Sequence, residues 1–184
     1  MKVLAIIPAK MDSKRLPGKN MKEINGLSLV EHSVIYAKKS SHDVDIIISS
    51  ESIELKKLSE TLDVTFHHRG KEMCGDTEVV DVYIDILKNQ IKKYDLIVGL
   101  QPDHPDREHS LDNCIDYMTK NNYDDLITIE ENFKRSGSVR IFKHNHLINS
   151  NVSKRIGCLK DSATDIHYIK DLNKAKLKMK KKDD

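Results

Sequence analysis

The sequence has few of the residues that mark a disulfide scaffold, a membrane protein or a nucleic-acid binder. Its three cysteines, Cys74, Cys114 and Cys158, form an odd and widely spaced set that fits neither paired disulfides nor a zinc motif. No apolar run reaches the roughly 18 residues of a membrane span, and no signal-peptide cleavage pattern follows the short apolar stretch near the start. The 31 basic residues nearly balance the 29 acidic ones. We therefore expect a cytoplasmic globular protein with reduced thiols and no membrane or nucleic-acid partner.

Apolar runs alternate with helix-patterned stretches, which is typical of α/β proteins. The predicted strands span residues 3–7, 44–48, 64–66, 96–100, 126–129 and 139–142. The predicted helices span 27–37, 53–62, 80–91, 111–118 and 169–179, and Asp76 or Thr77 is expected to cap the third of them. Four successive strand–helix units imply right-handed crossovers, a mostly parallel sheet and a single Rossmann-like domain over residues 1–184. Ligands of such sheets bind beyond the carboxyl ends of the strands, so the site is expected in the loops there.

The loop after the first predicted strand, residues 8–20, is the most informative stretch. It carries four cations within ten residues, and Pro17 and Gly18 can form a tight turn that brings backbone amides to an oxyanion. A triphosphate needs such fixed positive groups and donors, because negative charge builds on its oxygens as the leaving group departs. The loop is neither a Walker A motif nor a dinucleotide fingerprint. From charge alone, a basic surface loop that binds nothing is an equally good interpretation.

The sequence of this loop resembles the signature of the sugar-acid cytidylyltransferases, the family of CMP-sialic acid and CMP-KDO synthetases. That signature reads roughly IPARxGSKRLPGKN, and the chain has IPAK at 7–10 and SKRLPGKN at 13–20. Further matches are SSE at 49–51, HRG at 68–70, CGDT at 74–77, LQPDHPDR at 100–107 and DIHYIKDL at 165–172. LQPDHPDR is similar to LQPTSPLR of the sialic-acid branch and to QGDEP of the KDO branch, and DIHYIKDL is similar to the DIDTPEDL motif of the family. The resemblance runs from residue 3 to about 175 and implies a nucleotidyltransferase fold.

The resemblance also implies roles for matched residues. The residues implied in catalysis, by holding the triphosphate, are Lys10, Arg15 and Lys19. The residues implied in nucleotide binding are Ala9, Ser13, Asn20, Arg69, Asp76, Thr77 and Gln101; amide and guanidinium groups can satisfy the edges of cytosine. Asp103 and Asp165 are the implied ligands of Mg²⁺, which prefers oxygen, although each has an ordinary alternative as a turn or cap residue.

Some positions depart from the family pattern. Lys10 replaces an arginine and loses its bidentate fork, and Asp12 replaces a glycine that is common there. His167 stands where a second aspartate is frequent; it would favour Mn²⁺ or simply fill space. The region 108–164, which in the family carries a dimerisation arm and helps to hold the sugar, looks shortened.

Basic residues in this shortened region are candidates for binding the carboxylate of the sugar. They are Arg135, Arg140, Lys154 and Arg155, with a solvated basic face as the equal alternative. The expected partners are CTP, a sugar acid and a second copy of the chain, since a homodimer is the family expectation.

Three functions remain open at this point. The leading hypothesis is a cytidylyltransferase that moves CMP from CTP to a 3-deoxy-2-keto sugar acid and releases pyrophosphate. The second keeps the fold but changes the base or the sugar. The third, motivated by Lys10, Asp12 and His167, is a non-catalytic nucleotide-binding protein with a degenerated site.

Overall fold

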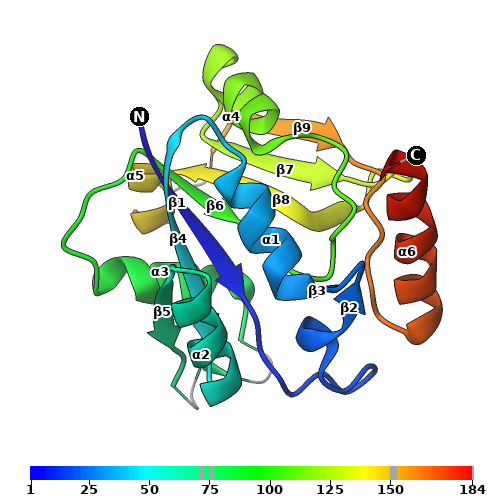
Figure 1. Ribbon diagram of the computed structural model, residues 1–184. Coiled ribbons are helices and arrows are strands. Elements are labelled where there is room, and N and C mark those ends of the chain that lie inside the picture. The colour runs from blue at the N-terminus through cyan, green and yellow to red at the C-terminus, as the bar shows by residue number, and fades with distance from the viewer. Residues whose placement is uncertain (71–72, 75–76, 150–152, 184) are drawn as a thin grey trace.

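The computed structural model describes residues 1–70, 73–74, 77–149 and 153–183, and a seven-stranded sheet lies at its centre (Figure 1). The strands are β1 (Lys2–Pro8), β4 (Asp43–Ser50), β5 (Thr65–His68), β6 (Leu96–Gly99), β7 (Asp125–Ile129), β8 (Arg135–Lys143) and β9 (Ile156–Lys160). Their order across the sheet is β5-β4-β1-β6-β8-β7-β9.

Most of the strand pairs are parallel. β1 pairs in parallel with β4 and β6, and β4 pairs in parallel with β5. β8 is antiparallel to β6 and β7, whereas β9 is parallel to β7. The prediction of a mostly parallel α/β sheet is confirmed. Because β5, β4, β1 and β6 run in the same direction, the loops that follow them meet at one edge of the sheet.

Helices cover both faces of the sheet. One face packs against α1 (Leu29–Lys38), α2 (Ile53–Thr61) and α4 (Leu111–Lys120), and the other against α3 (Val79–Lys88) and α5 (His144–Ile148). Alternate residues of β1 serve the two cores: Val3 and Ile7 face the first, and Leu4 and Ile6 face the second. A strand covered on both faces needs apolar residues at every position, which explains its continuous hydrophobic run.

A third, smaller core attaches the carboxyl-terminal helix to the loop after β1. That loop contains the short helix η1 (Lys19–Met21) and the hairpin of β2 (Glu23–Ile24) and β3 (Leu27–Ser28). Helix α6 (Ile169–Asp183) lies beside this hairpin, as Figure 1 shows, and buries Leu172 and Ala175 against Ile24, Leu29 and Ile166. The apolar side chains on one face of α6 therefore hold this lysine-rich helix against the rest of the domain. None of the described helices combines the length and apolar character needed to cross a membrane.

Several predictions about the elements need correction. Helix α3 begins at Val79 with Glu78 as its N-cap and without a side-chain cap, so Thr77 does not cap it; Asp76 lies outside the described residues. Ile91 lies beyond the end of this helix and is fully exposed. Five elements, η1, β2, β3, α5 and β9, were not predicted, and β8 begins earlier than expected. The other predicted strands and helices are confirmed to within a few residues.

Candidate active site

The cation-rich loop after β1 folds back on itself at the carboxyl edge of the sheet. Gly18 has φ 62°, a left-handed conformation that glycine adopts without strain, and the η1 helix follows it directly. The Asn20 side chain, which is buried, donates a hydrogen bond to the Lys10 backbone carbonyl at 2.7 Å. The two ends of the loop are thus tied together, and Lys10 and Lys19 are directed to the same place.

A cavity of about 200 Å³ lies between this loop, the loop after β5, helix α3 and the loop after β6. Its lining contains eight of the residues implied by the resemblance, from four separate parts of the sequence. They are Lys10, Ser13, Lys19, Asn20, Arg69, Thr77, Gln101 and Asp103. The remaining lining residues are Pro8, Val79, Val82 and Pro102.

Lys19 connects three of the matched motifs. Its Nζ atom donates to Asp103 Oδ2 at 2.5 Å and to the Ile166 backbone carbonyl at 3.1 Å, and both charged side chains are largely buried. Burial alone would raise the pKa of the Asp103 carboxyl, but contacts with His104 and Lys19 outweigh it and hold that pKa well below its ordinary value. Asp103 is therefore ionised, and its charge is shared with a cation from the first loop.

The second predicted metal ligand lies on the other side of His104. The Nε2 atom of His104 is 4.0 Å from Asp165 Oδ1, and the Nε2 atom of His167 is 3.0 Å from Asp165 Oδ2. Asp103, His104 and Asp165 each offer one ligand atom, and these atoms lie within 4.8 Å of one another. Two carboxylates this close suit a divalent cation, so the donor set fits the implied Mg²⁺; the imidazoles are additional.

Arg69 and Gln101 both present polar side chains to the cavity. Arg69 is buried, its NH2 group donates to the Ser49 carbonyl at 3.2 Å, and burial lowers its pKa below the ordinary arginine value. Its Nε atom has no hydrogen-bond partner among the described residues. Gln101 lies against Gly137, where a Cβ atom would come within 2.5 Å of the Gln101 side chain. Only glycine leaves room for this position of the amide.

A network of buried polar groups fixes the segment that carries Asp165. The backbone N–H and the hydroxyl of Thr164 donate to Asp106 at 2.7 and 2.8 Å, and Lys178 of α6 lies 3.4 Å from the same carboxylate. The Ile166 N–H donates to the Asp103 carbonyl at 3.0 Å. These contacts join the 161–166 segment to the loop after β6, so the two carboxylates of the proposed metal site are held together.

Several residues implied by the resemblance do not line this cavity. Ala9 is wholly buried in the core, and Arg15 lies exposed, 6.0 Å from the ring of Tyr168. Arg135 is exposed as well, and Asp76 lies outside the described residues. Arg140 pairs with Asp125 at 2.9 Å and stacks on Phe142, because antiparallel pairing brings β8 beside β7.

Asp165 lines a neighbouring hollow of about 570 Å³. Its other lining residues include His167, Tyr168, Lys170 and Lys174, and it lies beside α6.

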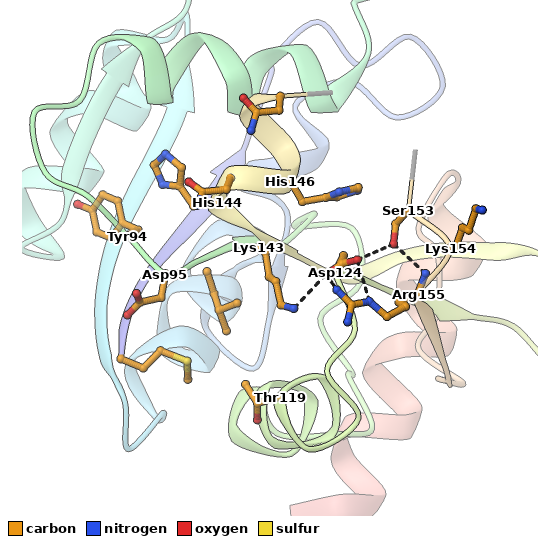
Figure 2. A pocket seen from close by; sticks show the side chains of 14 residues that line it. Tyr94, Asp95, Thr119, Asp124, Lys143, His144, His146, Ser153, Lys154 and Arg155 are labelled. Atoms are coloured by element: carbon orange, nitrogen blue, oxygen red, sulfur yellow. Dashed lines mark hydrogen bonds and ion pairs between the residues drawn. The ribbon is translucent and has the colours of Figure 1, made fainter. Parts of the chain in front are cut away.

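A larger cavity of about 800 Å³ lies at the opposite edge of the sheet, beside the beginnings of β1 and β6. Figure 2 shows that its central carboxylate, Asp124, is already bound by Lys143, Ser153 and Arg155. The seven residues of β1 separate this cavity from the Lys19 loop by about 20 Å. Lys154 and Arg155, two of the candidates for the sugar carboxylate, line this distant cavity.

Three structurally important residues were not singled out from the sequence. They are His104, Asp106 and Gly137. His104 and Asp106 stand where the LQPTSPLR motif has serine and leucine, and that departure is the signal that could have identified them. The importance of Gly137 has no sequence signal, since it depends on the approach of Gln101 from another loop.

Relatives and solved structures are similar to the chain over different lengths. It is 32% identical over 113 residues to the CMP-N,N'-diacetyllegionaminic acid synthase of Legionella pneumophila, an alignment that covers 59% of this chain and 49% of that protein. It is 30% identical over 105 residues to the 8-amino-3,8-dideoxy-manno-octulosonate cytidylyltransferase of Shewanella pealeana, covering 57% of this chain and 42% of that protein. The chain thus spans less than half the length of either relative.

The fold is shared with solved cytidylyltransferases. A CMP:2-keto-3-deoxy-manno-octonic acid synthetase complexed with CTP superposes with a TM-score of 0.79 at 13% identity, covering 99% of this chain and 100% of that one. A cytidylyltransferase from Leptospira borgpetersenii superposes with a TM-score of 0.71 at 19% identity, covering 96% and 85%. A sequence model of a family described as cytidylyltransferase matches residues 4–179. The chain therefore belongs to the cytidylyltransferase family.

Proposed function

We propose that the chain transfers CMP from CTP to a sugar acid and releases pyrophosphate. The observation that carries this proposal is the position of Lys19, which contacts Asp103 and the Ile166 carbonyl at the wall of a cavity lined by two further cations, Lys10 and Arg69. Family membership and the activities named for the relatives support the same reaction.

In this reaction the phosphate oxygens of CTP contact the first loop. Lys10 and Lys19 bind these oxygens and stabilise the charge that develops as the bond between the α- and β-phosphates breaks. The new bond joins the α-phosphorus to the acceptor's anomeric oxygen, whose proton passes to solvent, and pyrophosphate leaves. Asp103 and Asp165 would hold Mg²⁺, which when bound neutralises phosphate charge and polarises the phosphoryl group.

The base of the nucleotide lies between Arg69 and Gln101 in this proposal. Both side chains line the cavity, and Arg69 keeps a buried donor without a partner among the described residues. A buried donor of this kind is costly unless a ligand satisfies it. The carbonyl and ring nitrogen of cytosine supply suitable acceptors, and the Gln101 amide can both donate and accept.

The acceptor we propose is a 3-deoxy-2-keto sugar acid with eight or nine carbons. The relatives named above act on acids of this size, and the Asp165 hollow beside the cavity is lined by Lys170 and Lys174, whose charges suit a carboxylate. We also propose Mg²⁺ dependence, a homodimer and a cytoplasmic location, on the strength of the family resemblance.

Pyrophosphate release tests the function directly. The purified chain is incubated with Mg²⁺, each of the four nucleoside triphosphates and a panel of octulosonic and nonulosonic acids. We expect release with CTP and at least one acid. Calorimetry with the same nucleotides separates the alternatives: tight CTP binding without turnover on any acid would favour a non-catalytic binding protein, preference for another base would favour the second hypothesis, and no nucleotide binding would refute the proposal.

A further inference from the structure

His104 lies between the two carboxylates that we propose as metal ligands. It follows Asp103 in the loop after β6, and only 3% of its side chain is exposed. Its Nδ1 atom is 3.0 Å from Asp103 Oδ1, and its Nε2 atom is 4.0 Å from Asp165 Oδ1. This buried imidazole therefore contacts Asp103 with one nitrogen and has Asp165 beside the other, beyond hydrogen-bond distance.

The contact with Asp103 determines the chemistry of the other nitrogen. An ionised carboxylate accepts hydrogen bonds only, so in the neutral imidazole the proton is on Nδ1 and the lone pair is on Nε2. Histidines that bind metals commonly donate their second N–H to a carboxylate in this way, which fixes the ring and strengthens the nitrogen ligand. The lone pair of Nε2 is therefore on the side of Asp165.

Asp103 itself is less available as a metal ligand than the sequence suggests. Oδ2 accepts from Lys19 at 2.5 Å, and Oδ1 is the atom that His104 contacts. Asp165 has different surroundings, since a histidine ring nitrogen lies beside each of its oxygens: that of His104 beside one and that of His167 beside the other. The donors around Asp165 are thus nitrogen as well as oxygen.

We propose that this site binds a first-row transition-metal ion more tightly than Mg²⁺, with His104 Nε2 and Asp165 as ligands and Asp103 orienting the imidazole. The proposal rests on the proposed function, in which a divalent ion serves at Asp103 and Asp165. Mg²⁺ strongly prefers oxygen ligands and gives up its waters reluctantly, whereas imidazole is a good ligand for the iron, nickel, copper and zinc ions. Mn²⁺ stands at the weak end of this series, so its preference over Mg²⁺ gives a lower limit for the effect. A serine in the place of His104 has no ring nitrogen and could not make this distinction.

Mn²⁺ is the probe, because its binding and its ligands are both visible by electron paramagnetic resonance without any turnover. The metal-free protein is titrated with Mn²⁺ and, in competition, with Mg²⁺, in the absence and presence of CTP. We expect Mn²⁺ to bind at least about 10-fold more tightly, and the pulsed spectrum to show coupling to a nitrogen nucleus.

Variants assign the nitrogen to a residue. His104→Asn keeps a side chain that can donate to Asp103 but has no Nε2, so we expect loss of the nitrogen coupling and an approximately 10-fold or greater fall in Mn²⁺ affinity, with Mg²⁺ affinity changed much less. His104→Gln provides a second variant, and circular dichroism confirms the fold of each. His146→Asn is the matched control, because His146 lines the cavity at the opposite edge of the sheet, and we expect no change.

Three results would overturn the proposal. They are equal affinity for Mn²⁺ and Mg²⁺ in the unmodified protein, nitrogen coupling that persists in both folded His104 variants, and coupling that is lost in His167→Asn instead. Failure of the proposed function is distinguishable from these, since an unchanged preference for Mn²⁺ without CTP binding in calorimetry would refute the cytidylyltransferase activity and leave the metal site in place.

Discussion

Asp106 holds the segment that carries Asp165, and replacing it with asparagine removes one charge without changing its size. The Asp106 side chain has no exposed surface, and it accepts two hydrogen bonds from Thr164, at 2.7 and 2.8 Å. Hydrogen bonds to an ionised acceptor contribute about 1.5–3 kcal/mol each. The asparagine side chain can still accept one of these hydrogen bonds through its neutral carbonyl oxygen. Its NH2 group faces the other donor and cannot accept from it.

We therefore expect Asp106→Asn to lower the free energy of unfolding by about 2–3 kcal/mol. The lost attraction between Asp106 and the half-exposed Lys178 contributes little to this loss. For a chain of this length such a loss corresponds to a melting temperature lower by about 4–12 °C. Urea denaturation followed by circular dichroism measures the free energy, and thermal melting provides the second estimate.

Thr164→Val removes the hydroxyl donor and keeps the backbone N–H, so a double-mutant cycle with it tests the contribution of the side-chain hydrogen bond. We expect Thr164→Val to destabilise the unmodified protein clearly and the Asp106→Asn background much less, because the interaction is already weakened there. Asp63→Asn is the control, as Asp63 is exposed. A change below about 0.5 kcal/mol for Asp106→Asn, the range of ordinary surface substitutions, would refute the reasoning.

Three further predictions concern the site, the thiols and the distant cavity. Lys19→Ala should lower the rate of pyrophosphate release by about 100-fold, whereas the exposed Lys14→Ala should change it little; equal effects would contradict the role of Lys19. Cys158 is exposed and should react quickly with a thiol reagent at pH 8, and Cys158→Ser should remove the fast phase. Burial raises the pKa of Cys114 to about 12, so this thiol should react only after unfolding, and fast labelling of Cys114 would show that the core is open. The hydrogen bond from Lys143 and those from Ser153 and Arg155 lower the pKa of Asp124 to about 2, below its ordinary value near 3.9. The ionised Asp124 carboxylate therefore stabilises the fold fully above about pH 4, and this contribution is lost as the pH falls toward 2. The difference in unfolding free energy between the unmodified protein and Asp124→Asn should shrink over that range. A constant difference would contradict the lowered pKa of Asp124.

The elements that the sequence predicts well are those whose pattern is local. β1 and β6 are continuous apolar runs, and such runs are expected where helices cover both faces of a sheet. β9 lacks this pattern, because it is an edge strand with exposed Ile156 and Cys158. Its pairing with β7 depends on a neighbour that lies about thirty residues away in the sequence, and no local pattern reports that.

The candidate site likewise has features that the sequence predicts and features that only the folded structure shows. The motifs of the first loop and of the loop after β6 predict that Lys10, Lys19, Gln101 and Asp103 belong together, and the structure places all of them at one cavity. The motifs do not reveal which partner each charge has. The bond between Lys19 and Asp103 joins residues 84 positions apart, and only the packed structure brings them into contact.

In the proposed function, the Lys19–Asp103 ion pair makes nucleotide and metal binding thermodynamically dependent on each other. A phosphate that binds Lys19 withdraws its charge from Asp103, and the carboxylate then attracts a cation bound beside it more strongly. A cation beside Asp103 would likewise release Lys19 for the phosphate. Linkage requires the two effects to be equal, so the factor by which the metal tightens CTP binding would also be the factor by which CTP tightens metal binding. The doubly occupied state would then be favoured over either singly occupied one.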